Sequence, residues 1–352
     1  MLQASYKKHT LQFITPGGTS RGVLTTKNSW YIQVWDVRNP TVSGVGECSI
    51  LPHLSIDDKP GFEDKLRELC ANINRYASNY RSNMEDELLA WPAIRFGLEM
   101  ALLDLKNGGH KTIFASDFVE GKKSIPINGL IWMGEVDYMK EQLAQKIDSG
   151  FKCIKMKIGA IDFEQEINLI REIRKTYNSA QLEIRVDANG AFNSGEALAK
   201  LNELAKLGIH SIEQPIKAGQ WQKMAGLCAE SPVDIALDEE LIGISDSYKR
   251  EELLATVKPA YIILKPSLLG GFKACDQWVQ AANKLGIAWW ATSALEGNIG
   301  LNAIAQWTAI QDNTLPQGLG TGQVFANNIA SPLEVKNGHL IYNKKQPWGT
   351  IP

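Results

Sequence analysis

Apolar and polar residues alternate along the first part of the chain, from Leu2 to about Gly46. The clearest stretch is 30–37, Trp-Tyr-Ile-Gln-Val-Trp-Asp-Val. A period of two residues is typical of strands with one buried face, so this region predicts an antiparallel sheet. Asn39 and Pro40 are turn-forming residues, and we expect the turn there.

Apolar positions at helical spacing follow at 61–80 and 91–105. Pro92 lies where the first turn of a helix tolerates proline, which supports a helix start at that point. Sheet and helices together predict an α+β domain over residues 1–120. The tail, 332–352, contains one more strand-like segment and is expected to return to this domain and complete it.

From residue 125 the pattern changes to short apolar strands, each followed by an amphipathic segment of helix length. The expected strands are 125–131, 153–158, 182–186, 209–212, 234–237, 260–264, 288–291 and a short one near Gly318, and the expected helices include 163–177, 194–207, 247–256 and 271–285. About eight such units predict an α/β fold in which a parallel barrel closes over residues 121–331. A doubly wound open sheet is the alternative, but no GxGxxG follows the first of these strands.

Charged residues recur at the ends of the predicted barrel strands, where the catalytic groups of such barrels lie. They are, in order, Lys155, Lys157, Asp187, Glu213, Asp238, Lys265 and Glu296. Steps of 26, 25 and 27 residues lead from Asp187 to Glu213, to Asp238 and to Lys265, one strand–helix unit each time. We therefore expect these side chains at the same level around one ring.

Three carboxylates at one point repel each other unless a cation lies among them. The five histidines show no HxH or HExxH spacing, so an oxygen-liganded ion is favoured over zinc. Mg²⁺ fits best, and Mn²⁺ is possible. The ordinary alternative for Asp187 and Asp238 is helix or turn capping.

Lys155 and Lys157 are two residues apart in a predicted strand, so both side chains point to the same face. Lys265 is expected to meet them from the opposite side of the ring. A lysine beside other cations has a lowered pKa and suits a general base near neutral pH. The alternative is that each lysine extends along the rim into solvent.

Composition limits the classes of partner. Hydrophobic residues make up 44% of the 352, charged residues 22%, and the net charge is −2, which predicts a globular protein that binds neither nucleic acid nor an anionic membrane. No apolar run reaches about 20 residues, and the N-terminus lacks the core of a signal peptide. Five scattered cysteines fit reduced thiols. We expect a cytoplasmic protein that acts on a small carboxylate, and its oligomeric state stays open.

These motifs together resemble the muconate-lactonizing-enzyme subgroup of the enolase superfamily, along nearly the whole chain. The matching segments are Lys-Met-Lys at 155–157, Val-Asp-Ala-Asn-Gly at 186–190, Ile-Glu-Gln-Pro at 212–215, Leu-Asp-Glu at 237–239 and Leu-Lys-Pro at 264–266. The resemblance implies a capping domain on a modified (β/α)₇β barrel. It also implies the following roles: Asp187, Glu213 and Asp238 bind Mg²⁺, Lys157 and Lys265 flank the substrate, Lys155 polarises or positions it, and Asn189 and Glu239 lie beside the ligands.

Further segments are similar to the o-succinylbenzoate synthase family within that subgroup. They are the loop 46–55, the helix 91–101, Ser-Ala-Leu-Glu at 293–296 and Gly-Leu-Gly-Thr-Gly at 318–322. By this likeness the substrate contacts are Leu51, Ser55, Ser293, Glu296, Gly318 and Leu319. The loop departs from the family pattern at Ile50 and His53, which leaves its conformation open. Dipeptide epimerases carry an Asp-x-Asp after the last strand, and none occurs here.

The resemblance implies a Mg²⁺-dependent syn-dehydration of 2-succinyl-6-hydroxy-2,4-cyclohexadiene-1-carboxylate to o-succinylbenzoate, a step of menaquinone biosynthesis. Two lysines on opposite faces of a substrate also suit an N-acylamino-acid racemase or a cycloisomerase, which is the alternative among enzymes. A barrel that keeps the fold without chemistry is the alternative outside enzymes, and it predicts a broken lysine pair or a missing carboxylate.

Overall fold

The computed structural model describes residues 1–19, 22–78, 87–132, 134–159 and 161–351. Its strands are β1 (Leu2–Thr19), β2 (Gly22–Asp36), β3 (Asn39–Ser49), β4 (Ile125–Pro126), β5 (Gly129–Ile131), β6 (Cys153–Lys157), β7 (Glu183–Asp187), β8 (Ser211–Glu213), β9 (Asp234–Leu237), β10 (Tyr261–Leu264), β11 (Ala288–Ala291), β12 (Leu333–Lys336) and β13 (His339–Tyr342). Its α-helices are α1 (Phe62–Ala71), α2 (Ile73–Ser78), α4 (Pro92–Lys106), α5 (Val136–Asp148), α6 (Phe163–Thr176), α7 (Ala197–Ala205), α8 (Trp221–Glu230), α9 (Ser247–Val257), α10 (Pro266–Leu269), α11 (Phe272–Lys284) and α12 (Asn298–Ala309). Two short 3₁₀ helices lie at Glu239–Leu241 and Thr321–Gln323.

The N-terminal strands form the expected antiparallel sheet, in the order β1-β2-β3. The turn lies at Val37 and Arg38 rather than at Asn39 and Pro40, because Asn39 already pairs with Asp36. Proline at that position costs little, since it lies near the start of an edge strand. The last two residues of the expected helix 61–80 lie outside the described part of the chain.

Helix α4 begins at Pro92 as expected and packs directly on β3. A β-carbon on Gly46 would lie 1.8 Å from the carbonyl oxygen of Gly97, so this contact needs glycine. Residues 46–49 therefore belong to a buried strand, and the expectation that the whole segment 46–55 is a loop is wrong for its first four residues.

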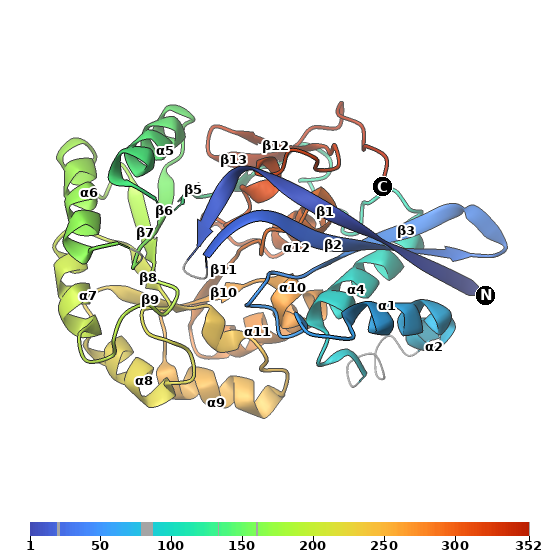
Figure 1. The fold of residues 1–352 in the computed structure, drawn as a ribbon, viewed down its shortest axis with the longest axis horizontal. Coiled ribbons are helices and arrows are strands. Elements are labelled where there is room, and N and C mark those ends of the chain that lie inside the picture. Colours follow the sequence, from blue (N-terminus) through green and yellow to red (C-terminus); the bar gives the residue numbers. More distant parts are fainter. Residues whose placement is uncertain (20–21, 79–86, 133, 160, 352) are drawn as a thin grey trace.

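The barrel strands form one parallel sheet in the order β11-β10-β9-β8-β7-β6-β5, with helices on its outer side (Figure 1). Single bridges of Gln317 to Ile127 and of Gly318 to Thr292 join its two edges. The ring is thus closed by a two-residue seam where we expected a short strand, and the open doubly wound sheet is excluded.

The expected first barrel strand, 125–131, is divided in two. Residues of β4 pair with β13 of the tail, and the chain then turns so that the Asn128 amide donates to the carbonyl oxygen of Gln317. The tail therefore pairs with β4 rather than with a strand of the N-terminal sheet, while Lys344 pairs with Glu120 at the end of the expected N-terminal domain. The tail hairpin buries Leu340 in the same core as the barrel, and Tyr342 packs edge-on against Phe118. The domain boundaries themselves stay a prediction.

The hairpin of β1 and β2 reaches across to the C-terminal end of the barrel (Figure 1). Phe13 bridges to Phe325, and a small apolar cluster there unites Leu11, Leu295 and Phe325. This packing sets one wall of the space above the strand ends. None of the helices in the described ranges is long and apolar enough to cross a membrane.

Candidate active site

Three lysines and three carboxylates meet at the C-terminal ends of β6 to β10. The Lys155 ammonium lies 2.8 Å from Asp187 Oδ2 and 2.6 Å from Glu213 Oε2. Lys157 donates to the same Asp187 oxygen at 2.5 Å, and Lys265 pairs with Asp238. The predicted convergence is therefore present in this structure.

Strand register explains part of the convergence. Lys157 is the partner of Asp187, and Asp187 is the partner of Glu213, on successive parallel strands. These three residues therefore share one level, whereas Glu213 pairs with Ala236, so Asp238 lies two residues further along, just past the end of β9. The lysine side chains are only 6 to 14% exposed, so the surface alternative is wrong for all three.

Capping explains the contact of one Asp187 oxygen and none of the contacts of Asp238. Asp187 Oδ1 accepts from the Asn189 amide at 3.0 Å, a local turn bond, while its other oxygen takes both lysines. Asp238 precedes a 3₁₀ helix but makes no side-chain capping bond. Both carboxylates thus face the cluster of charges.

Burial and neighbouring charges shift the pKa values of these groups in opposite directions. Burial raises the pKa of Asp187, but Lys155 and Lys157 outweigh it and hold this pKa below its usual range. Burial and the charge of Asp187 raise the pKa of Glu213 to about 7. Burial lowers the pKa of Lys265, but Asp238 and Glu213 outweigh it and raise it.

Burial likewise lowers the pKa of Lys155, and Asp187 and Glu213 outweigh it, so its pKa lies above the usual value. The expected lowering is therefore wrong for Lys155 and Lys265 in this arrangement. The reason is that each ammonium is itself the counterion of a buried carboxylate.

The donor set fits a hard divalent cation, although the ligand arrangement is not formed. Across the described ranges, no group of three or more His, Cys, Asp or Glu side chains is arranged to hold a metal, since lysine ammonium groups lie against the carboxylates. Glu213 Oε1 is nevertheless buried without a hydrogen-bond partner, and Lys265 is 3.8 Å from it. An unsatisfied buried carboxylate oxygen is costly, and a cation would relieve it.

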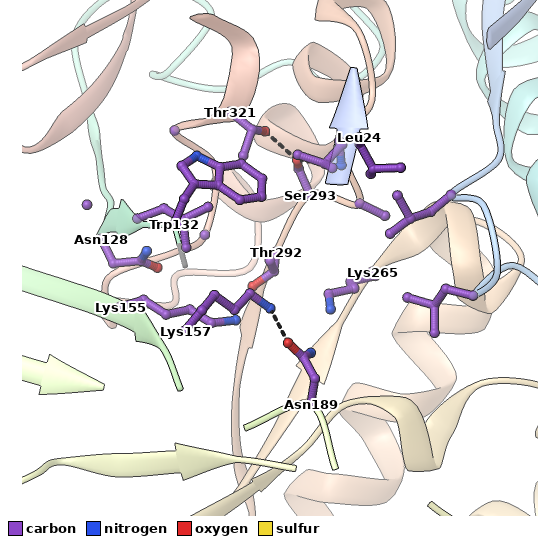
Figure 2. A pocket seen from close by; sticks show the side chains of 18 of the residues that line it. Leu24, Asn128, Trp132, Lys155, Lys157, Asn189, Lys265, Thr292, Ser293 and Thr321 are labelled. Carbon is purple, nitrogen blue, oxygen red and sulfur yellow. Dashed lines mark hydrogen bonds between the residues drawn. The ribbon is translucent and has the colours of Figure 1, made fainter. Parts of the chain in front are cut away.

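An open cavity lies over the cluster (Figure 2). All three lysines line it, and so do four of the predicted sites: Asn189, Leu51, Ser293 and Gly318. The N-terminal region contributes Leu24 and the turn 51–54. The cavity therefore has a charged floor and a largely apolar upper wall.

Three predicted substrate contacts do not line this cavity. Ser55 is buried and its hydroxyl accepts from the Leu51 amide, so it holds the turn. Leu319 is fully buried in the core. Glu296 is fully buried and accepts from Ser267 and from the Ala294 amide. These three are corrected to supporting positions, because their side chains are already used in packing or hydrogen bonds.

The two residues expected beside the ligands form a chain that starts at a lysine. Lys157 donates to Asn189 Oδ1 at 2.8 Å, and the side-chain nitrogen Nδ2 of Asn189 donates to Glu239 Oε1 at 3.0 Å. Asn189 has φ 44°, the left-handed region in which asparagine is well tolerated. The chain holds the Lys157 ammonium at the cavity.

Sequence reasoning missed several cavity residues, among them Asn128, Trp132, Thr292 and Thr321. Thr292 follows β11 directly, the position at which we sought charged residues on the other strands. The search for charge alone therefore passed over a neutral side chain that the strand-end rule could have found.

A buried carboxylate of the N-terminal sheet anchors the barrel end. Glu47 is fully buried and accepts from Ser29 Oγ at 2.7 Å and from the amides of Gly297 and Gly300 at 2.7 and 2.9 Å, at the start of α12. A carboxylate at a helix N-terminus is stabilised by the amides and the helix dipole. This contact ties β3 to the segment that carries Ser293.

We expect Glu47→Gln to lower the free energy of unfolding by about 3 kcal/mol, because one of the two glycine amides then faces the side-chain nitrogen of glutamine, which cannot accept a hydrogen bond. Urea unfolding followed by circular dichroism measures the change. Glu252→Gln, at an exposed position of α9, is the matched control and should stay within about 0.5 kcal/mol of the parent. Equal stability of the two variants would contradict an anchoring role for Glu47.

The comparisons with known proteins agree with this fold and arrangement. Residues 138–349 match the family model "Enolase C-terminal domain-like". The chain belongs to the enolase superfamily.

Within the superfamily, the chain is 48% identical to an o-succinylbenzoate synthase from Desulfotalea psychrophila, over 96% of this chain and 98% of that protein. A crystal structure of MenC from the same organism has a TM-score of 0.84, with 44% identity, 97% of this chain and 99% of the other covered. A dipeptide epimerase from Enterococcus faecalis, solved with Mg and a dipeptide, also has a TM-score of 0.84, covering 96% of each chain, but is only 18% identical and shows the fold alone.

Proposed function

We propose that this enzyme dehydrates 2-succinyl-6-hydroxy-2,4-cyclohexadiene-1-carboxylate to o-succinylbenzoate, with Mg²⁺ as cofactor. The observation that carries the proposal is the pair Lys157 and Lys265, which line one cavity from β6 and from the residue after β10, above three carboxylates. The 48% identity to an o-succinylbenzoate synthase supports this reaction over others that the same geometry allows.

Lys157 is the base in this proposal. It removes the proton from the carbon that bears the ring carboxylate, and Asn189 holds its ammonium at the cavity. The same lysine then returns the proton to the departing hydroxyl on the same face, which makes the elimination syn. Lys265 stays protonated and stabilises the negative charge that develops on the carboxylate from the other side.

Asp187, Glu213 and Asp238 would hold Mg²⁺, and the ion would supply Lewis-acid stabilisation of the substrate carboxylate. The role of the protein side chains is then to set charge balance. Three ammonium groups offset three carboxylates in this arrangement.

Five free cysteines fit a reducing compartment, and we place the reaction in the cytoplasm, as a step of menaquinone biosynthesis. The ligand is a small dianion that the cavity can enclose. Neither a nucleic acid nor a membrane surface is needed for this reaction.

Lys265→Arg separates the dehydratase from the racemase alternative. A dehydratase needs only the charge of Lys265, so the arginine variant should retain measurable dehydration. A racemase needs a proton to leave this residue, and arginine's pKa lies far too high for that at neutral pH. The measurement is product formation from the cyclohexadiene beside racemisation of N-succinyl amino acids, by parent and variant.

Lys284→Arg, at an exposed lysine of α11, is the matched control. Circular dichroism and Mg²⁺ titration establish that the buried arginine is accommodated. Complete loss of dehydration in a folded, Mg²⁺-binding Lys265→Arg protein would refute the electrostatic role of Lys265. A parent enzyme that racemises but does not dehydrate would refute the proposed function itself.

A further inference from the structure

Two polar side chains that line the cavity have oxygens without a partner. Asn128 is 4% exposed and Thr292 is 9% exposed. Neither Asn128 Oδ1 nor Thr292 Oγ1 has a hydrogen-bond partner in the described part of the chain, and both atoms are shielded from bulk water. A buried polar atom left unpaired is costly, so pairing with a ligand group is favourable.

These residues lie on either side of the seam that closes the barrel. The backbone amide of Asn128 donates to the carbonyl oxygen of Gln317. Thr292 forms a β-bridge with Gly318, the next residue. Two strand spacings place their α-carbons about 10 Å apart. Both residues line the same cavity, so their unpaired oxygens face the space that a ligand occupies.

Gly318 fixes the position of the Thr292 hydroxyl. A β-carbon on Gly318 would lie 2.5 Å from Thr292 Oγ1 and 2.8 Å from its methyl group. Any larger residue would therefore turn the threonine away. In Figure 2 both side chains point to the space into which Lys155 and Lys157 also extend.

We propose that Asn128 and Thr292 form the subsite for the substrate hydroxyl that leaves. This inference rests on the proposed function. The substrate has two carboxylates, a ketone and one hydroxyl, and only the hydroxyl can donate a hydrogen bond at neutral pH. Asn128 Oδ1 can only accept, so the hydroxyl is the group that satisfies it, and the same oxygen pairs with the Thr292 hydroxyl.

The subsite orients the bond that breaks. Lys157 takes the α-proton, the electron pair left on carbon forms the new ring double bond, and the carbon–oxygen bond breaks with its electron pair going to oxygen. That oxygen takes the proton from Lys157 and leaves as water. Asn128 and Thr292 gain and lose no proton. They hold the oxygen on the face where the proton is returned, and the product, which lacks the hydroxyl, makes neither bond.

Thr292→Val and Asn128→Leu keep the approximate shape of each side chain and remove its hydrogen bond. We expect each to lower kcat/KM for dehydration roughly tenfold or more. The dissociation constant of o-succinylbenzoate, measured calorimetrically with Mg²⁺ present, should change less than about twofold. Thr292→Ser should recover most of the activity that valine removes.

Gly318→Ala tests the supporting contact and should resemble Thr292→Val, because its new methyl group displaces the hydroxyl. Gly226→Ala, where no atom lies within 4 Å of the added carbon, controls for the glycine change. Thr308→Val, at a buried threonine of α12 that bonds within its own helix, controls for the loss of a hydroxyl.

Dehydration unchanged in Thr292→Val and Asn128→Leu would overturn the subsite. It would also be overturned if product binding weakened as much as kcat/KM fell, since the two residues would then shape the cavity rather than hold the hydroxyl. Absence of dehydration in the parent enzyme would instead refute the proposed function, and the subsite with it.

Discussion

Lys157→Ala is expected to lower kcat for dehydration by roughly 10³-fold or more, because loss of a general base alone is typically worth about 10²–10⁴-fold. Lys157 is the lysine that both lines the cavity and is held by Asn189. Asp187 keeps Lys155 as a partner at 2.8 Å, so the variant should remain folded. Stopped-flow or steady-state absorbance of the aromatic product measures the loss.

The matched control is Lys152→Ala, an exposed lysine just before β6. It should keep the parent kcat and the parent circular dichroism. A second readout is exchange of the α-proton with deuterium in the substrate-like ligand N-succinylglycine, which needs the base but no leaving group. Exchange and turnover that both survive in Lys157→Ala would assign the base to another residue.

Glu213→Gln is expected to abolish Mg²⁺-dependent turnover, with a loss of at least about 10²-fold. Glu213 lies between Asp187 and Asp238 in the ring and has the unpaired buried oxygen Oε1. Glutamine keeps the shape but removes the negative charge that a hard cation requires. Excess EDTA should abolish turnover of the parent enzyme, Mg²⁺ or Mn²⁺ should restore it, and Zn²⁺ should restore it poorly.

Calorimetric titration with Mg²⁺ gives a readout independent of turnover, and the dissociation constant of Glu213→Gln should rise at least tenfold. Glu230→Gln, exposed at the end of α8, is the control and should bind Mg²⁺ like the parent. Parent activity that persists after dialysis against EDTA would rule out the three-carboxylate metal site.

The barrel could be predicted well because its strands are short, buried and regularly spaced. β9 and β11 have the expected bounds, and β6, β7, β8 and β10 differ by one or two residues. Strand ends were harder to place at the seam. Gln317 and Gly318 make only single bridges, and no apolar run marks so short a pairing.

The candidate site was predictable where charge marked it and unpredictable where it did not. The six charged groups of the ring follow from two lysines on β6 and one charged residue at the end of each of the next four strands. Glu296 has the same sequence signal, yet Ser267 and the Ala294 amide already use its oxygens. Asn128 carries no charge and follows a proline-interrupted strand, so nothing local indicated that it would line the cavity.

The sequence by itself determined the barrel, the two lysines on one strand face and the ring of three carboxylates. These depend on local periodicity and on the constant length of a strand–helix unit, which are properties of consecutive residues. Only the tertiary structure decided which oxygens are satisfied, that lysines lie against the carboxylates, and that the tail pairs with β4. The physical reason is that hydrogen-bond satisfaction and burial depend on segments distant in sequence, which meet only when the chain has folded.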